Sequence, residues 1–487
     1  MSRTFSLCIS AIALALAPAL AKERPNIVYI LADDMGYDSV SVNNPKIGGM
    51  KTPNIDRLAA QGMNFSDAHS GSAVCTPTRY GLLTGRYCWR SRLKKSVLWD
   101  YGQPLIEENR MTVAEFLKAQ GYRTAMVGKW HLGLHWRKSD GSLANGDILD
   151  TDASFQKNEG AERIKRTAAA IDFSKAISGG PTDEGFDSWF GMEAPNFPPY
   201  TWIVDNKVNE VPTVPKPKDM FGIPGMMVEG WKLEEILPTL GKKSAEYIAS
   251  AAKRDDPFFL YVPLTSPHTP IAPSAEWKDK SGITHYADFV METDAIVGQI
   301  MKAIDDAGIT ENTLVIFSCD NGSSPHQGQM AELGKKGTDL YHHFKGHKTQ
   351  IHEGGHRVPF IVRWPAKVAA GSTNDEVTWL GDFFATVADI LEHPLPATAA
   401  EDSTSILPLI IGDKKKLPNR PLVVNHDIGG RFAIRKGPWK LVMVKGGQLF
   451  HLGKDPKEAN NVAKEHPDVV KELQETLKIY RSDDRSR

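Results

Sequence analysis

The sequence predicts an α/β protein: a large mixed, mostly parallel sheet sandwiched by helices, then a smaller C-terminal α+β domain with a short antiparallel sheet. Three observations predict this class. Short apolar runs are continuous rather than alternating, as in parallel strands that are buried on both faces. Helical patterns lie between these runs. The pattern changes after a Pro-containing, polar stretch at 394–418.

Five apolar runs are predicted strands, and we expect all of them to be parallel. They are Asn26–Ala32, Thr124–Val127, Phe258–Val262, Thr313–Ser318 and Phe360–Arg363. The predicted helices between them are Asn54–Gln61, Thr112–Gln120, Gly241–Lys253, Tyr286–Ala307 and Asp382–Leu391. A glycine follows three of these helices, where left-handed backbone commonly ends a helix.

The C-terminal part has a different pattern. Phe432–Ile434, Trp439–Val444 and Gln448–Leu452 are separated by Gly/Pro turns, which favours a short antiparallel meander, and a final helix is predicted near Pro467–Tyr480. We therefore expect a large α/β domain at 22–395 and a smaller C-terminal α+β subdomain at 396–487.

The N-terminus has the pattern of a secretory signal peptide at residues 1–21. Arg3 precedes a mostly apolar stretch, and Ala19-Leu20-Ala21 is a small-x-small cleavage site. We expect an exported protein, periplasmic or extracellular, without stable membrane insertion, because no other stretch has the roughly 20 apolar residues that span a bilayer. The net charge of −1 excludes a global field that would steer the protein to nucleic acid.

Polar side chains follow the predicted strands directly. Asp33 and Asp34 follow the first strand, and Asp320 and Asn321 follow the fourth. Ligands of open α/β sheets bind beyond the carboxyl ends of the strands. Three carboxylates and one amide suit a hard divalent cation, Ca²⁺ or in its place Mg²⁺. The alternative is that the Asp-Asp pair only caps a turn.

The segment Cys75-Thr76-Pro77-Thr78-Arg79, continuing through Leu82-Leu83-Thr84-Gly85, resembles the signature of the type I (formylglycine-dependent) sulfatases of the alkaline phosphatase superfamily. The similarity is to the arylsulfatase A-like group and covers most of the chain, including PNIVYILADDMGYD, GYRTAMVGKWHLG and TLVIFSCDNG. It implies that a formylglycine-generating or anaerobic sulfatase-maturing enzyme converts Cys75 to Cα-formylglycine. Hydrolysis of a sulfate monoester, of a carbohydrate or an aryl alcohol, is the expected reaction.

The resemblance also implies roles for single residues. Asp33, Asp34, Cys75, Asp320 and Asn321 would hold the cation. Arg79 would steady the hydrated formylglycine, Lys129 and Lys348 would bind sulfate oxygens, His131 would be the base of the elimination step, and His268 would contact the sulfate and, with Lys348, assist the leaving oxygen. Cys88 and Cys319 are expected to be buried thiols.

Three alternatives remain open at this point. The first two are a phosphoester or phosphonate hydrolase of the same superfamily and, if Cys75 stays unmodified, a non-catalytic protein that binds sulfated glycans. The third is a zinc protease, because His352-Glu353-Gly354-Gly355-His356 matches the pattern H-E-x-x-H literally. That pattern binds zinc only on a helix, and the two glycines disfavour a helix here. His326, His342, His343 and His347 are loop histidines that either line the substrate pocket or face solvent.

Overall fold

The computed structural model describes residues 24–146, 159–325 and 329–487. The predicted signal peptide and His326 lie outside these ranges. Within them we find no helix with the length and apolarity that a bilayer crossing requires.

A ten-stranded mixed sheet forms the centre of the described part of the chain, in the order β13-β2-β12-β11-β1-β10-β4-β5-β6-β7. Its five middle strands are parallel: β11 (Thr313–Cys319), β1 (Asn26–Ala32), β10 (Phe258–Pro263), β4 (Arg123–Lys129) and β5 (Ser188–Met192). The central strand β1 is buried along nearly its whole length, which explains its unbroken apolar sequence.

The strand predicted at Phe360–Arg363 is present as β12, but the prediction that it is parallel is wrong. It runs antiparallel to β11 and to β2 (Met63–Phe65). The chain leaves β11 at the carboxyl edge of the sheet and re-enters at that same edge. Within the described part of the 40 residues between the two strands, 320–359, there are two helices, of six and four residues, and neither crosses back over the sheet.

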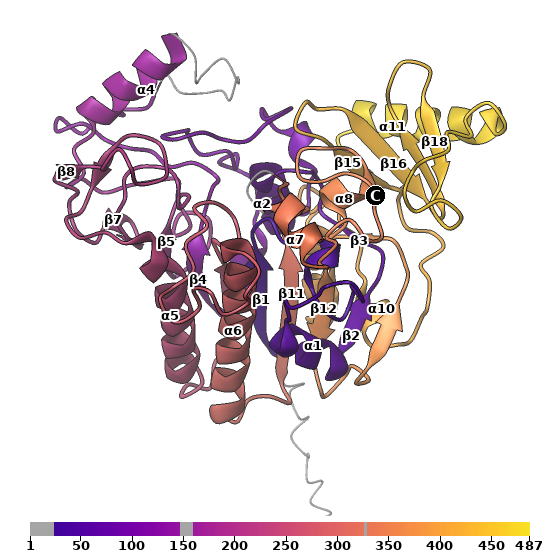
Figure 1. The fold of residues 1–487 in the computed structure, drawn as a ribbon, viewed down its shortest axis with the longest axis horizontal. Coiled ribbons are helices and arrows are strands. Elements are labelled where there is room, and N and C mark those ends of the chain that lie inside the picture. The colour runs from indigo at the N-terminus through magenta and orange to yellow at the C-terminus, as the bar shows by residue number, and fades with distance from the viewer. Residues whose placement is uncertain (1–23, 147–158, 326–328) are drawn as a thin grey trace, which may run out of the picture.

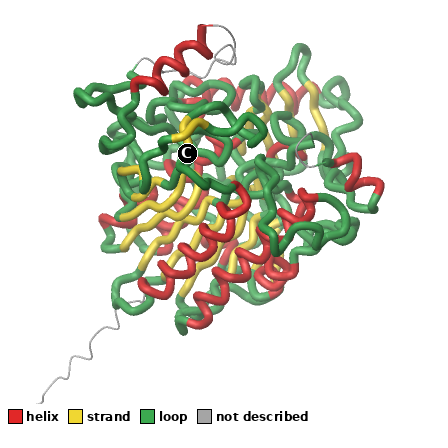
Figure 2. The backbone as a smooth tube through the Cα atoms, turned by 60° about the vertical axis from the view of Figure 1, so that its left-hand side comes forward, coloured by secondary structure: helices red, strands yellow, loops and turns green. Residues whose placement is uncertain are grey.

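Helices cover the sheet in two groups. In Figure 1, α1 (Pro53–Ala60), α5 (Ile236–Ala251) and α6 (His285–Asp306) stand in front of the strands. A second group, α2 (Cys75–Thr84), α3 (Val113–Ala119) and α9 (Asp382–Ile390), packs on the other face, where Phe383 of α9 contacts Tyr29 of β1 with ring centroids 4.9 Å apart. Figure 2 shows the helices layered on the strands from another side.

The remaining elements are short and lie mostly around the edges of the sheet. They are β3 (Ala68–His69), β6 (Ile203–Val204), β7 (Lys207–Val208), β8 (Val214–Pro215), β9 (Met226–Met227), β13 (Ser372–Asn374), β14 (Thr378–Trp379), α4 (Glu159–Ala170), α7 (Met330–Lys335), α8 (Glu353–His356), α10 (Leu407–Ile410) and the 3₁₀ turns η1 (Tyr37–Ser39), η2 (Cys88–Arg90) and η4 (Leu233–Glu235).

The C-terminal part forms an antiparallel sheet, as predicted, but with four strands where the sequence analysis expected three. Its strands are β15 (Val423–His426), β16 (Phe432–Lys436), β17 (Trp439–Val442) and β18 (Gln448–His451), and α11 (Pro467–Ser482) packs on them. The sequence analysis missed β15. The expected fold class is confirmed; the domain boundary at 395 remains a prediction.

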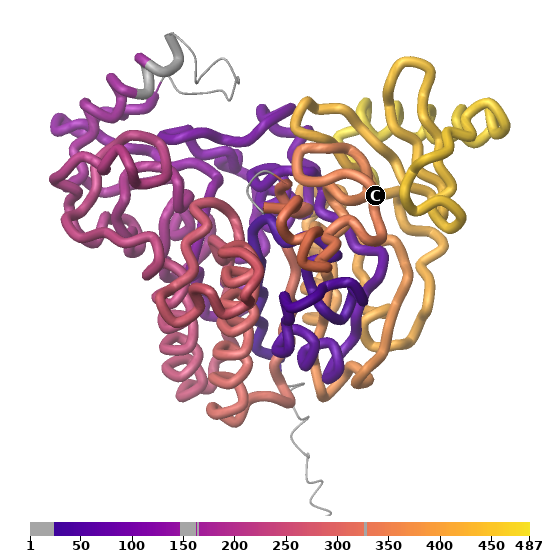
Figure 3. The backbone as a smooth tube through the Cα atoms, viewed as in Figure 1, coloured from indigo at the N-terminus to yellow at the C-terminus, as the bar shows by residue number. Residues whose placement is uncertain are grey.

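Backbone hydrogen bonds join β15 of the C-terminal sheet to the loop between β3 and α2. The Ala73 amide donates to the His426 carbonyl over 3.0 Å, and the His426 amide donates to the Gly71 carbonyl over 3.3 Å. After α11 the chain turns back to the loop between α9 and α10, where Arg487 Nε donates to the carbonyl of Ala400 over 2.8 Å (Figure 3). The segment just before Cys75 therefore lies directly against the C-terminal sheet.

Candidate active site

Two strand ends bring four oxygen-bearing side chains together at the carboxyl edge of the sheet. Asp33 and Asp34 follow β1, and Asp320 and Asn321 follow β11; all four are at most 1% exposed. Asn321 Nδ2 donates to Asp34 Oδ1 over 2.7 Å, and the Asp34 amide donates to Asp320 Oδ1 over 3.2 Å. The structure thus brings these predicted cation ligands together.

Ligand atoms of Asp33, Asp34, Cys75 and His268 lie within 4.8 Å of one another. The Oδ1 atom of Asn321 is buried and has no hydrogen-bond partner among the described residues. Buried polar groups without a partner are unusual, and an amide oxygen beside carboxylates is a typical ligand of a hard cation. The donor set therefore fits a divalent cation. His268 was predicted to contact the sulfate and was not among the predicted cation ligands.

Cys75 is the first residue of α2, with Val74 in extended backbone before it. Its Sγ atom lies 3.6 Å from Asp33 Oδ1. Burial and the charge of Asp320 raise the pKa of the Cys75 thiol, so the unmodified side chain stays protonated and is a weak nucleophile.

Three basic side chains neutralise the three carboxylates. Lys129 Nζ donates to Asp33 Oδ2 over 2.6 Å, Arg79 Nη2 donates to Asp320 Oδ2 over 2.7 Å, and Lys348 Nζ donates to Asp34 Oδ2 over 2.8 Å. Burial opposes the charge of Asp33, but Lys129, together with His268 and Arg79, holds the pKa of that carboxyl well below its usual range. A divalent cation would release the ammonium groups to bind an anion.

The two candidate histidines are both held neutral. Burial and the neighbouring Lys348 lower the pKa of His268 to about 4, and burial and Lys129 lower the pKa of His131 well below its usual value. Each ring has one nitrogen on a backbone carbonyl: His268 Nδ1 on Thr269 O at 2.6 Å, and His131 Nε2 on Leu98 O at 2.9 Å. A carbonyl only accepts, so the bonded nitrogen carries the proton and the other nitrogen keeps its lone pair.

The free lone pair of His131 is on Nδ1, which is buried and has no partner among the described residues. The free nitrogen of His268, Nε2, lies 3.9 Å from Asp34 Oδ2. Both rings are therefore poised to accept a proton inside the site rather than to carry one at neutral pH.

The backbone around the site is strained at three non-glycine residues. Asp34, His131 and Thr349 have φ of 64°, 56° and 77°. For a β-branched residue such as Thr349 this is a rare conformation, and it places the neighbouring Lys348. At the end of β4, Gly128 has φ of 139°, and a Cβ there would lie 1.9 Å from the Pro263 carbonyl, so only glycine allows Lys129 to reach Asp33.

The sequence analysis missed the residues that hold the site in place. Glu193 Oε2 accepts from the His131 amide over 3.0 Å, and the Met35 amide donates to Cys319 Sγ over 2.8 Å. Burial raises the pKa of Glu193 to about 8. Cys75, Cys88 and Cys319 are all buried and free, as expected for the last two. No motif in the sequence marks Glu193.

The pattern His352–His356 does not form a zinc site. Only Glu353–His356 is helical, in the single turn of α8, and His352 lies before it in extended backbone. Glu353 is instead part of a buried network: Arg357 Nη2 lies 2.6 Å from its Oε2, Arg435 Nη1 3.2 Å from the same oxygen, and Lys440 Nζ 3.0 Å from its Oε1. Asp67 pairs with Arg357 and Arg435, and Glu458 pairs with Lys440, so the charge of Glu353 is part of a network of three acids and three bases.

Fold and site together define a hydrolase of anionic esters, with a candidate cation site, two ammonium groups and a modifiable side chain at a helix N-terminus. The family model described as "Sulfatase" matches residues 25–393, and "N-sulphoglucosamine sulphohydrolase, C-terminal" matches 342–483. The chain belongs to the sulfatase family and is a sulfuric ester hydrolase.

Curated relatives agree. The N-acetylgalactosamine-6-O-sulfatase of Bacteroides thetaiotaomicron is 33% identical, over 94% of this chain and 94% of the relative. Human arylsulfatase A is 30% identical, over 95% of this chain and 89% of its own length. A solved structure from work on the metabolism of multiple glycosaminoglycans by Bacteroides thetaiotaomicron has a TM-score of 0.80 and 30% identity, and covers 95% of this chain and 100% of its own. Membership of the family implies a formylglycine and a divalent metal.

Proposed function

We propose that this chain removes the 6-O-sulfate of an N-acetylgalactosamine or a similar sugar after export, with Cys75 converted to formylglycine and Ca²⁺ bound by Asp33, Asp34, Asp320 and Asn321. The observation that carries the reaction is the position of Cys75 at the start of α2, with its Sγ 3.6 Å from Asp33 and in one cluster with Asp34 and His268. The substrate class rests on the printed activity of the relative with 33% identity.

When present, the hydrated formylglycine supplies an oxygen nucleophile, and the cation lowers the pKa of that oxygen and polarises the sulfate. The chain's own residues do the rest. Lys129 and Lys348 would turn from Asp33 and Asp34 to the sulfate oxygens, where their charge stabilises the transition state. His131 Nδ1, which has a lone pair and no partner, would accept a proton. The overall reaction is R–O–SO₃⁻ plus water to R–OH, sulfate and a proton.

His268 would act at the leaving oxygen. Its pKa of about 4 describes a site without an anion. A sulfate ester bound against Nε2 favours the protonated ring, because an adjacent negative charge raises the pKa of a histidine. His268 would then donate to the sulfate or to the leaving oxygen, beside Lys348.

Two other functions have less support. The phosphonate monoester hydrolase of Agrobacterium radiobacter has a TM-score of 0.59 but 20% identity, which shows a common fold alone. A non-catalytic glycan-binding role would require Cys75 to remain a thiol.

The test is mass spectrometry of the Cys75 peptide from protein co-expressed with a formylglycine-generating enzyme, together with sulfate release from a panel. The panel contains N-acetylgalactosamine 6-sulfate, its 4-sulfate isomer, N-acetylglucosamine 6-sulfate, p-nitrophenyl sulfate and p-nitrophenyl phosphate. We expect an aldehyde at position 75 and the highest kcat/KM for the first sugar. An intact, alkylatable thiol in active protein, or retained activity in Cys75→Ala, would contradict the mechanism. A higher rate on the phosphate would contradict the reaction class.

A further inference from the structure

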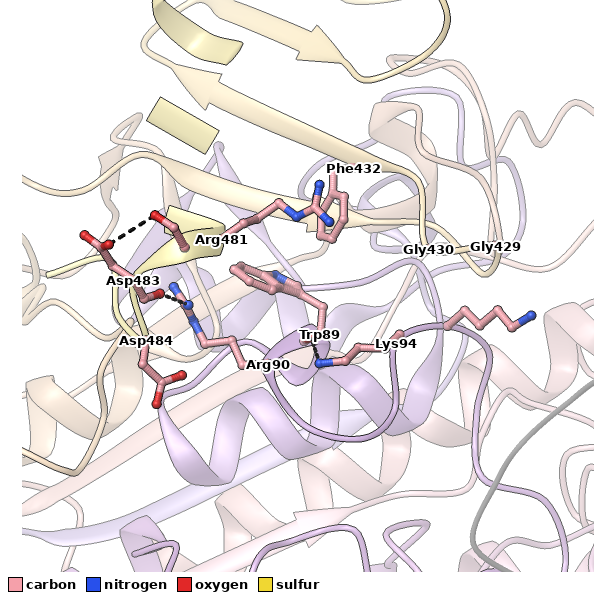
Figure 4. A pocket seen from close by; sticks show the side chains of 11 residues that line it. Trp89, Arg90, Lys94, Gly429, Gly430, Phe432, Arg481, Asp483 and Asp484 are labelled. Atoms are coloured by element: carbon pink, nitrogen blue, oxygen red, sulfur yellow. Dashed lines mark hydrogen bonds between the residues drawn. The ribbon is translucent and has the colours of Figure 1, made fainter. Parts of the chain in front are cut away.

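A pocket of about 730 Å³ lies between residues 89–95 and the C-terminal part of the chain (Figure 4). Its walls come from three places that are far apart in the sequence: η2 with the following loop, the turn between β15 and β16, and the end of α11. The lining residues used below are Trp89, Lys94, Lys95, Gly430, Phe432 and Arg481. None of them belongs to the candidate active site.

One wall of the pocket is aromatic. The rings of Trp89 and Phe432 meet edge to face, with centroids 5.5 Å apart, and Tyr87 stacks behind Trp89 at 5.6 Å. The Arg481 guanidinium lies over the Phe432 ring, 4.9 Å from its centroid, as Figure 4 shows. The Nε1 of Trp89 is buried and has no partner among the described residues. The Arg90 guanidinium lies over the Trp89 ring, 4.3 Å from its centroid, and Trp89 is only 6% exposed. The ring faces are therefore covered, and the exposed Arg481 guanidinium over Phe432 offers planar donors to an anion.

The pocket also carries uncompensated positive charge. Lys94, Lys95 and Arg481 are exposed, and none of them forms an ion pair with a carboxylate within the described ranges; Lys94 Nζ donates only to the Trp89 carbonyl. Arg90 is different, because Asp402 binds it at 2.8 Å. On the acidic side, Asp484 is paired with Arg86 at 2.8 Å. The remaining charged groups of the pocket are Lys94, Lys95 and Arg481 on one side and Asp483 on the other, which gives the lining a net charge of +2.

Two backbone connections place this pocket beside the active site. Three residues after Lys95, the Leu98 amide donates to Thr76 Oγ1 over 3.2 Å, and the Leu98 carbonyl accepts from His131. On the other side of the pocket, the Ile428 amide donates to the Thr349 carbonyl over 3.3 Å, next to Lys348. Three residues span at most about 11 Å, so Lys95 lies within the length of a short oligosaccharide from Leu98.

We propose that this pocket binds an anionic saccharide unit of the substrate other than the unit that carries the reacting sulfate. The charge of that unit is a second sulfate ester or a uronate carboxylate. The pocket makes the enzyme selective for oligosaccharides over single sugars. The role in turnover rests on the proposed function; the binding itself does not.

The first experiment compares Lys95→Ala/Arg481→Ala with the matched control Lys253→Ala/Lys278→Ala, which removes two exposed lysines elsewhere. On a sulfated tetrasaccharide we expect kcat/KM to fall about 10-fold through KM, since two exposed charge contacts together contribute about a factor of ten. On p-nitrophenyl sulfate we expect no change in the variant, and on both substrates no change in the control. The salt dependence of KM for the tetrasaccharide should also weaken. An equal loss on both substrates, or no loss on the tetrasaccharide, would overturn the proposal.

The second experiment measures binding without turnover. In the Cys75→Ala background, calorimetry follows the same tetrasaccharide, an analogue with only uronate carboxylates on the remote units, and a neutral analogue. Loss of affinity on adding Lys95→Ala/Arg481→Ala supports the pocket even if the wild type releases no sulfate from any substrate, which would contradict only the proposed function. Retained binding of the uronate analogue identifies a carboxylate as sufficient, and its loss identifies sulfate. Equal binding of the neutral analogue would contradict the proposal.

Discussion

The ammonium of Lys129 lies 2.6 Å from a carboxylate oxygen of Asp33, and neither side chain has any exposed surface. Arg79 with Asp320 forms an equally buried pair, and Lys348, whose side chain is 13% exposed, pairs with Asp34, so three acids meet three bases and the net charge is zero. The chain therefore neutralises the candidate cation site with its own side chains.

Removal of the cation should abolish activity without unfolding the protein, because the three basic side chains keep the acids paired. At a Ca²⁺ concentration about 100 times its Kd, the cation would add about 2.7 kcal/mol of stability. Calorimetry in EDTA should show a cooperative transition a few degrees lower, and excess Ca²⁺ should restore both Tm and activity. Unfolding on chelation at 25 °C would contradict this reading.

Lys129→Met should lower kcat/KM by about 10²- to 10³-fold, the usual effect of removing a group that stabilises transition-state charge. It also leaves Asp33 buried without its partner, which costs about 3–5 kcal/mol when nothing replaces the ammonium. Because the proposed Ca²⁺ site includes Asp33, a bound cation would compensate the lost ammonium, and the loss of stability should be larger in EDTA than in Ca²⁺. Urea unfolding in both conditions measures the difference, with Lys253→Met as the control. The same loss in both would show that no cation contacts Asp33.

Arg79→Lys keeps the charge but loses the planar group. Arg79 donates to Asp320 through both Nε and Nη2, and its Nη1 donates to the Lys129 carbonyl over 3.0 Å. A lysine cannot form these three bonds in one geometry. We expect the free energy of unfolding to fall by about 2 kcal/mol or more, because a buried charged group loses hydrogen-bond partners. We also expect a strong fall in kcat. Wild-type kcat in this variant would show that activity does not require the planar guanidinium group of Arg79.

Glu353→Gln tests whether the buried network joins the two sheets. Glu353 receives Arg357 of the large part and both Arg435 and Lys440 of the C-terminal sheet. Without its charge the three cations share only Asp67 and Glu458, which leaves one buried positive charge uncompensated, and we expect a loss of about 3–5 kcal/mol. Differential scanning calorimetry should show a lower Tm, with Glu246→Gln on the surface of α5 unchanged. A Tm within one degree of wild type would contradict this role.

The pH dependence of stability should include a contribution from His426. Burial lowers its pKa to about 4. Between the unfolded value of about 6.5 and that folded value, the unfolded chain binds the proton and the folded chain does not, so stability is complete above pH 6.5 and falls as the pH drops. The slope is at most about 1.4 kcal/mol per pH unit for one histidine. Urea unfolding from pH 7 to 4 should show a shallower slope for His426→Asn, and the wild-type slope for the exposed His285→Asn.

The sequence allowed the central strands to be predicted because they are buried on both faces, as in β1 and β11. It did not reveal β15, whose four residues VVNH include two polar ones, because their partners are the segment before Cys75 and not solvent. The orientation of β12 depends on where the chain re-enters the sheet, which no local pattern records.

The candidate site divides in the same way. Asp33, Asp34, Asp320 and Asn321 were visible because they follow apolar strands. Glu193 and the Leu98 carbonyl, which orient His131, were not, since a single loop glutamate and a backbone oxygen carry no signal in the sequence. The proximity of His268 to the carboxylates depends on the tertiary fold.

The hydrogen bonds of His426 with Gly71 and Ala73 also bear on the order of events during synthesis. Cys75 is 2% exposed in the folded chain, so the proposed conversion to formylglycine would have to precede the enclosure of this segment. His426 is synthesised about 350 residues after Cys75. At ribosomal rates of about 5–20 residues per second, that interval is on the order of tens of seconds. Because the C-terminal sheet is synthesised late, Cys75 would remain accessible to a modifying enzyme during synthesis. Folding of that sheet would then bury it.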